Sequence, residues 1–233
     1  MERIILIETS TALCSAALAE DGAIVSYRES PASKAHASLT AVFIQEMLSE
    51  RGLTVADCDA ICVSKGPGSY TGLRVGVSTA KGLCFGSGRP LLAVGTLDTL
   101  VAQAADIITN GTEGVSYRHI IPMIDARRME VYTAVFDPDG TQITETAPMI
   151  IDGNSFADVL ADGPVLFIGD GAGKCADVIS HPDARFLQCQ PKASAMLTPA
   201  LAAYKEKRFE DVAYFEPFYL KEFVATVSKK KLF

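Results

Sequence analysis

The stretch that decides the fold covers residues 66–83 and has the sequence GPGSYTGLRVGVSTAKGL. It follows an apolar, β-branched segment at residues 60–64, which predicts a buried strand. The Gly-Pro-Gly that begins the stretch predicts a tight turn after this strand. Ser69 is a suitable N-cap for a helix over residues 70–85, and the amide groups at the start of this helix could bind an anion.

The same stretch lacks the residues of two well-known catalytic loops. A Walker loop needs Gly-Lys-Ser/Thr at the start of the helix, whereas Lys81 lies far along it. A serine-hydrolase elbow needs glycines two positions on either side of its serine, and Pro67 and Thr71 stand there around Ser69. The sequence therefore predicts no catalytic residue in this loop.

Small residues recur every four positions along the predicted helix, at Gly72, Gly76 and Ala80. Each glycine costs about 1 kcal/mol relative to alanine in a helix interior. A protein tolerates this cost where another helix must approach closely. The spacing alone leaves open whether that helix belongs to the same lobe or to a second subunit.

Another helix, predicted over residues 33–51, has an apolar surface that is wider than one sheet can cover. Such a surface implies a second partner and favours a helical bundle between subunits. We therefore predict a partner interface on the helices of the first half. Its residues are His36, Leu39, Val42, Phe43, Met47, Tyr70, Gly72, Leu73, Gly76 and Ala80.

The order of predicted elements in the first half is repeated in the second. Each half begins with an apolar strand, at residues 3–7 and 119–124, and an acidic turn follows at Glu8 and Asp125. A hairpin with an Asp-Gly turn, a helix and another strand come next in both halves. This duplication predicts an α/β protein of two similar lobes, with the actin-like ATPase fold that sugar kinases, heat-shock chaperones and actin share.

The predicted lobes comprise residues 1–108 and 117–233, with a polar linker near residues 110–116. The sequence leaves open whether the carboxy-terminal segment after about residue 214 packs back on the first lobe. The other predicted strands cover residues 14–19, 23–28, 91–94, 129–136, 141–151 and 165–168, and the other helices cover residues 96–105, 155–161 and a short segment after residue 173.

Acidic turns in this class of fold face the cleft between the lobes, where a carboxylate can hold a metal-bound nucleotide phosphate. ATP or ADP with magnesium is therefore a possible ligand, although none is predicted to be required. The alternative is that the acidic residues are inherited turn residues in an unused cleft. The candidate cleft residues are Glu8, Thr9, Ser10, Asp125, Gly169 and Gly171.

Composition limits the classes of function. The chain has 233 residues, of which 48% are hydrophobic, and a net charge of −7, so tight unaided binding to nucleic acid is not expected. Six scattered cysteines and three distant histidines show no metal-ligand spacing, so no metal site is predicted. Without a signal peptide or membrane span, the chain is predicted to be cytoplasmic, with no membrane partner.

Several motifs together resemble the TsaB family, also called YeaZ, over essentially the whole chain. The motifs are ILIETSTALCSAAL at residues 5–18, SKAHASLT at 33–40, the glycine-rich stretch at 66–83, MIDARRMEVYTA at 123–134 and EPFYLKE at 216–222. The resemblance implies the actin-like fold and a non-enzymatic subunit of the complex that forms threonylcarbamoyladenosine in tRNA.

The resemblance also implies the partners. A TsaD-like catalytic subunit would pair with helices of the first lobe, a TsaE-like ATPase would join the pair, and tRNA would be met only through the complex. The isolated chain would form a homodimer through the same face. Residues 95–104 lack the two metal-binding histidines of TsaD-like relatives, and Glu8 replaces a common aspartate. The competing hypothesis is a small-molecule kinase or ATPase of the same fold.

Overall fold

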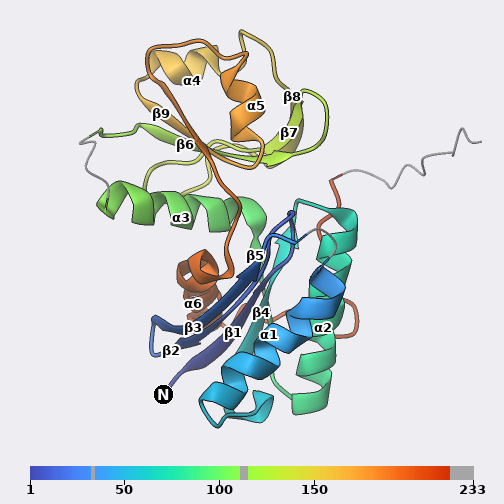
Figure 1. The fold of residues 1–233 in the computed structure, drawn as a ribbon. Coiled ribbons are helices and arrows are strands. Elements are labelled where there is room, and N and C mark those ends of the chain that lie inside the picture. Colours follow the sequence, from blue (N-terminus) through green and yellow to red (C-terminus); the bar gives the residue numbers. More distant parts are fainter. Residues whose placement is uncertain (33–34, 111–114, 221–233) are drawn as a thin grey trace, which may run out of the picture.

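A computed structural model describes residues 1–32, 35–110 and 115–220. Most of the predicted linker and the basic tail at residues 228–231 lie outside these ranges. Two five-stranded mixed sheets form the centres of two lobes (Figure 1). The predicted duplicated α/β architecture is therefore confirmed.

The first sheet has the strand order β3-β2-β1-β4-β5. Strand β1 pairs antiparallel with β2 and parallel with β4. The bounds are β1 Arg3–Glu8, β2 Cys14–Glu20, β3 Ala23–Ser30, β4 Ala60–Gly66 and β5 Leu91–Gly95; the helices are α1 His36–Glu50, η1 Val55–Asp57, α2 Tyr70–Ser87 and α3 Thr96–Asn110.

The second sheet has the order β10-β9-β6-β7-β8. Strand β7 ends sooner than predicted, and a loop replaces much of the expected strand over residues 141–151. The strands are β6 His119–Asp125, β7 Glu130–Thr133, β8 Ala147–Ile150, β9 Val165–Gly169 and β10 Ala184–Gln188; the helices are α4 Ala157–Ala161, α5 Ala172–Ala176, η2 Ala193–Met196 and α6 Leu197–Lys205.

Both faces of the first sheet are covered, because alternate side chains of its strands point to opposite sides. Ile5 and Ile7 of β1 pack in a core with α1 and α2. Ile4 and Leu6 pack on the other side, against residues of η2 and α6 such as Met196. The chain therefore returns from the second sheet to complete the first lobe (Figure 1).

Helix α3 lies between the two sheets (Figure 1). Its residues Leu97, Leu100 and Val101 share a buried cluster with Ile120 of β6 and Ile168 of β9. The helix thus leaves the first sheet at β5 and packs on the second. This arrangement joins the lobes and fixes one side of the space between them.

Beyond α6, the chain continues along the first lobe. The Glu210 amide donates to the Leu91 carbonyl (2.8 Å), and the Phe218 amide donates to the Lys65 carbonyl (2.7 Å). Lys81 Nζ donates to the carbonyl of Ala213 (3.0 Å). The described part of the segment, up to residue 220, thus passes from the edge strand β5 across α2 to the end of β4.

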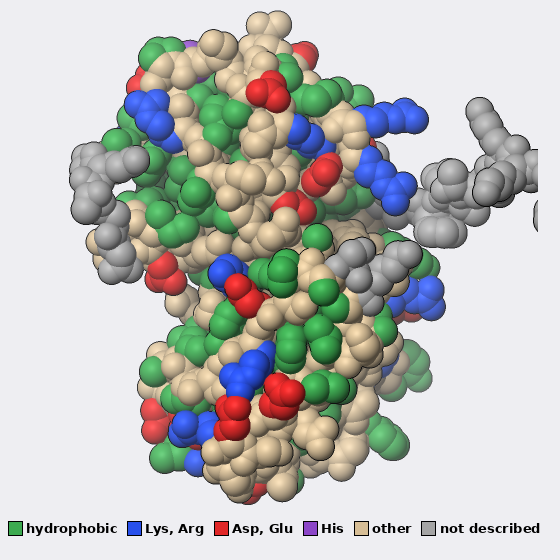
Figure 2. All heavy atoms as spheres, viewed as in Figure 1, with side chains coloured by type: hydrophobic (Ala, Val, Ile, Leu, Met, Phe, Trp, Pro, Cys, Tyr) green, Lys and Arg blue, Asp and Glu red, His purple; other side chains and the backbone are tan. Residues whose placement is uncertain are grey.

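Acidic and basic side chains are interspersed over both lobes on the face shown in Figure 2, without a broad area of one sign. This agrees with the low net charge and with the absence of a basic stripe in the sequence. Within the described residues, no helix is long and apolar enough to cross a membrane.

Candidate functional site

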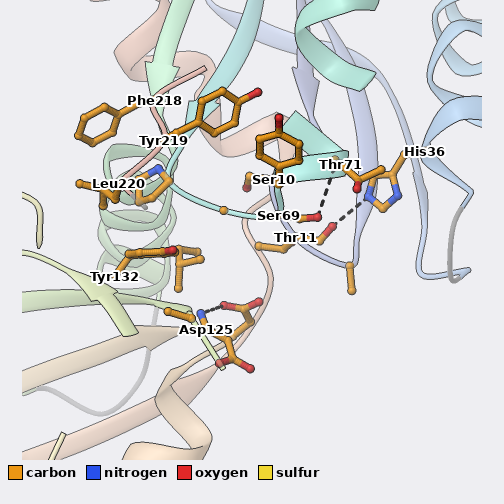
Figure 3. Close-up of a pocket in the computed structure, with 18 of the residues that line it drawn as sticks. Ser10, Thr11, His36, Ser69, Thr71, Asp125, Tyr132, Phe218, Tyr219 and Leu220 are labelled. Carbon is orange, nitrogen blue, oxygen red and sulfur yellow. Dashed lines mark hydrogen bonds between the residues drawn. The ribbon is translucent and has the colours of Figure 1, made fainter. Parts of the chain in front are cut away.

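A cavity of about 930 Å³ opens between the lobes, where β1, β4 and β6 end (Figure 3). The first lobe contributes hydroxyl groups and the start of α2 to its wall, and the second contributes the acidic turn after β6. Residues 218–220 form a third side. The lining includes Ser10, Thr11, His36, Ser69, Tyr70, Thr71, Asp125, Arg127, Tyr132, Asp170, Phe218, Tyr219 and Leu220.

Glu8 does not line this cavity. Its side chain has no exposed surface, and Oε1 accepts a hydrogen bond from the Ser10 amide (2.7 Å), whereas Oε2 has no hydrogen-bond partner among the described residues. Burial raises the pKa of this carboxyl to about 7, because the charged form loses its hydration. The predicted role of Glu8 at the cleft is therefore wrong: its carboxyl is enclosed in the first lobe.

Ser10 lines the cavity, but its hydroxyl is shielded from solvent and has no hydrogen-bond partner, as is true of Thr11 Oγ1. Thr9 points the other way, toward α2, and its Oγ1 donates to the Gly72 carbonyl (2.9 Å). Of the three residues predicted after β1, Ser10 alone reaches the cavity wall.

The glycines of α2 make room for this turn after β1. A Cβ on Gly72 would overlap the Thr9 carbonyl, a Cβ on Gly76 would overlap Thr9 Oγ1, and a Cβ on Gly68 would overlap the Ser10 carbonyl. The close approach is therefore made by the chain's own β1–β2 turn. The prediction that Gly72, Gly76 and Ala80 face a partner is wrong, because all three are buried within the lobe.

Three further residues of the predicted interface are also enclosed. Leu73 is 1% exposed and Met47 is 1% exposed, and Phe43 belongs to the same buried cluster as Met47. They face the first sheet, which α1 and α2 cover from one side (Figure 1). The width of the apolar pattern on α1 arises because this helix packs on both the sheet and α2.

The outward side of α1 and α2 carries small residues together with longer polar ones, which are Gln45, Glu46, Glu50 and Arg74. Val42 is 40% exposed, whereas His36, Leu39 and Tyr70 are half-buried. The sequence prediction missed Phe85, which is 88% exposed near the end of α2. The other exposed residues on these two helices include Ala37, Ala41, Thr71, Ser78, Gly82 and Gly86.

Asp125 lies on the second-lobe wall of the cavity, as predicted. Its Oδ1 is bound by Lys174 Nζ (2.6 Å) and accepts a hydrogen bond from the Arg127 amide (2.7 Å). The Asp125 amide donates to Asp170 Oδ1 (2.8 Å). Burial raises the pKa of Asp170 to about 6. Sequence reasoning missed Lys174, because it lies 49 residues from Asp125.

Gly169 and Gly171 lie behind the cavity wall, and the cavity lining does not include them. A Cβ on Gly169 would overlap the Met123 carbonyl, and a Cβ on Gly171 would lie 2.8 Å from Val131 Cγ1. The space beside both glycines is filled by β6 and β7 of the same lobe. Neither glycine lines the cavity, and their approach to a nucleotide stays a prediction.

An aromatic wall closes the cavity on the side of the carboxy-terminal segment (Figure 3). The rings of Tyr70 and Tyr219 lie 4.8 Å apart between centroids. The Arg74 guanidinium lies 5.3 Å from the centroid of the Tyr70 ring. Sequence reasoning assigned no role to Phe218–Leu220, although they lie in a motif typical of the family.

Chemically, the cavity offers hydroxyl groups, aromatic faces, one arginine and two engaged carboxylates. The described residues contain no group of three or more His, Cys, Asp or Glu side chains that could hold a metal ion. Ser69 Oγ accepts a hydrogen bond from the Gly72 amide (3.3 Å), which confirms the predicted helix cap.

Comparisons with known proteins agree with the two-lobed architecture. The family model of TsaD, tRNA N6-adenosine threonylcarbamoyltransferase, matches residues 29–228. The tRNA threonylcarbamoyladenosine biosynthesis protein TsaB of Escherichia coli is 30% identical, over 96% of each chain. TsaB of Bacillus subtilis is 32% identical over 71% of this chain and 70% of its own.

Among solved structures, an uncharacterised protein with similarity to peptidase YeaZ from Pseudomonas aeruginosa has a TM-score of 0.81 and 26% identity, covering 95% of this chain and 100% of that one. An activator of 2-hydroxyisocaproyl-CoA dehydratase from Clostridium difficile, with bound ADPNP, has a TM-score of 0.50 and 11% identity, covering 88% and 96%. The latter match concerns the fold alone.

Proposed function

Since the chain belongs to the TsaB family of tRNA threonylcarbamoyladenosine biosynthesis proteins, we propose that it is a non-catalytic scaffold subunit that pairs with a TsaD-like catalytic subunit. The observation that carries this proposal is the outward side of α1 and α2. We call this surface the pairing face and define it by Ala37, Ala41, Val42, Thr71, Ser78 and Gly82.

The pairing face allows another helix to come close, because its side chains are small and exposed. A Cβ on Gly82 would meet no atom within 4 Å, in contrast to the filled space beside Gly76. Small residues let helix backbones approach and bury apolar surface with little loss of side-chain entropy. Val42 and Phe85 supply larger apolar groups at two points of these helices.

The cleft supports the non-enzymatic part of the proposal. Nucleotide chemistry in a two-lobed cleft needs carboxylates that are free to bind a cation or accept a proton. Glu8 is enclosed in the first lobe, and Asp125 is already paired with Lys174. We propose that no cofactor is required. A TsaE-like ATPase would join the pair, and tRNA would be met only through the complex.

The pairing face is tested by a charge placed at its centre. Ser78→Arg, on the exposed side of α2, should reduce co-purification with the TsaD-like subunit at least tenfold, because a buried unpaired guanidinium opposes association. The same variant should convert the proposed homodimer of the isolated chain to a monomer, measured by sedimentation.

The matched control is Ser180→Arg, which introduces the same side chain at an exposed position of the second lobe. It should pair like the unmodified chain. Equal pairing by Ser78→Arg and Ser180→Arg would show that the partner binds elsewhere.

The alternative function is a small-molecule kinase or ATPase. The volume and hydroxyl lining of the cavity favour it, whereas the engaged state of Asp125 opposes it. A measurement of ATP turnover by the isolated chain separates the scaffold from the ATPase, since only an ATPase would turn over ATP without a partner.

A further inference from the structure

The ammonium group of Lys174 lies against the second-lobe turn, which we define as residues 125–130. Lys174 Nζ lies 2.6 Å from Asp125 Oδ1, 2.7 Å from the Arg128 carbonyl oxygen and 2.6 Å from the Glu130 carbonyl oxygen. A lysine ammonium has three donors, so these three oxygens use all of them. One carboxylate oxygen and two carbonyl oxygens are also ligands that a hard divalent cation takes.

Among the described residues, the first lobe contributes no carboxylate to the cavity lining. Glu8 is the acidic residue at the end of β1, but its carboxyl is fully buried and does not line the cavity. The cavity wall of that lobe presents Ser10, Thr11, Ser69 and Thr71, which are hydroxyl residues. A magnesium ion bridging the lobes would therefore depend on Asp125, whose Oδ1 is bound to Lys174 and to the Arg127 amide.

We infer that Lys174 takes the place of a divalent metal in the second-lobe turn, so that magnesium does not fit at Asp125. The ammonium holds the loop at residues 125–130, where Arg127 (φ 70°) and Arg128 (φ 50°) adopt left-handed backbone conformations that side chains rarely take. A second cation next to the ammonium would meet direct charge repulsion. A ligand of this cavity must then bind without a metal bridge to Asp125.

This inference deepens the non-catalytic part of the proposed function and does not rest on the pairing face. Its test uses the full isolated chain without any partner. A failed pairing experiment would not contradict the inference about Lys174. A failed metal-binding test would not contradict the pairing proposal.

The test measures binding of Mn²⁺ alone, by electron paramagnetic resonance, to the unmodified chain, Lys174→Ala and Asp125→Asn. Removal of the ammonium should expose the three oxygens, so Lys174→Ala should bind one Mn²⁺ at least tenfold more tightly than the unmodified chain. Asp125→Asn should match the unmodified chain, because the Lys174 ammonium already offsets the charge of the Asp125 carboxylate in the unmodified chain.

The matched control is Lys81→Ala. Lys81 Nζ also donates to two carbonyl oxygens, those of Ala213 (3.0 Å) and Phe215 (3.1 Å), but no carboxylate joins them. Its removal should leave Mn²⁺ affinity unchanged. A gain equal to that of Lys174→Ala would overturn the inference, because loss of any carbonyl-bound lysine would then suffice.

Lys174→Met, which keeps the apolar stem, replaces Lys174→Ala if the latter fails to fold. The inference is overturned if a folded Lys174 variant gains no affinity, because the three oxygens are then not a cation site. It is also overturned if the unmodified chain binds Mn²⁺ and Asp125→Asn loses it. The latter comparison needs no Lys174 variant.

Discussion

Glu8 is a carboxyl group without contact to solvent, at the end of β1. Its pKa is raised to about 7, above the ordinary value near 4.5, because burial penalises the charged form. The folded state therefore binds the proton more tightly than the unfolded state between about pH 4.5 and pH 7. Stability is highest below this window and is lost as the pH rises through it, until the folded carboxyl also ionises.

We predict that Glu8→Gln removes this loss. The free energy of unfolding of the unmodified chain, relative to Glu8→Gln, should fall by up to about 3 kcal/mol between pH 4.5 and pH 7. Urea unfolding at several pH values measures the difference. A difference that stays constant over this range would show that Glu8 is solvated or paired in the folded chain.

At the scale of single residues, the sequence predicted local interactions better than contacts between distant parts of the chain. Ser69 caps α2 as expected, because capping is a local interaction within one turn. The environment of Glu8 and the pairing of Asp125 with Lys174 depend on residues that the fold brings together from far along the chain. Composition and spacing carry no information on such contacts.

Helix α2 has two glycines six positions apart with opposite surroundings. Gly76 faces the Thr9 side chain, whereas Gly82 faces open space. We predict that Gly76→Ala lowers the free energy of unfolding by about 1–3 kcal/mol, because the new methyl group displaces Thr9 and its hydrogen bond to the Gly72 carbonyl.

Gly82→Ala is the matched control on the same helix. It should raise the stability by up to about 1 kcal/mol, since alanine is the better helix former and its Cβ meets no neighbour. Denaturant unfolding of both variants gives the comparison. Similar changes in both would mean that α2 does not pack against the β1–β2 turn as described.

Most elements were predicted from their periodicity, including the β1–β3 hairpin unit and helices α1 to α3. The predictions missed β10 and α6. Strand β10 is a short edge strand with a mixed pattern, and α6 is a short helix interrupted in sequence by Pro199. Both are defined by packing on a sheet, so periodicity alone was too weak to detect them.

At the scale of the whole molecule, the two lobes share one arrangement of elements, but their acidic residues have different surroundings. The two lobes share the plan of the actin-like ATPase fold, and an acidic residue ends the first strand of each sheet. The environments of these residues differ, however, because Glu8 is buried within the first lobe beside Ser10, whereas Asp125 is bound by α5 through Lys174. The cavity between the lobes remains, but Glu8 does not line it and Asp125 is paired with Lys174.

We therefore predict that the isolated chain does not hydrolyse ATP above background in the presence of magnesium. Hydrolysis in a two-lobed cleft needs a cation that neutralises the phosphates and a group that positions the attacking water. Glu8 is buried and does not line the cavity, and Asp125 is paired with Lys174, so neither of these two carboxylates supplies these functions. Phosphate release from the purified chain measures the rate, with Asp125→Asn as the comparison. Equal background rates are expected, because the carboxylate takes no part. Turnover by the unmodified chain that disappears in Asp125→Asn would contradict the scaffold proposal and favour a kinase or ATPase.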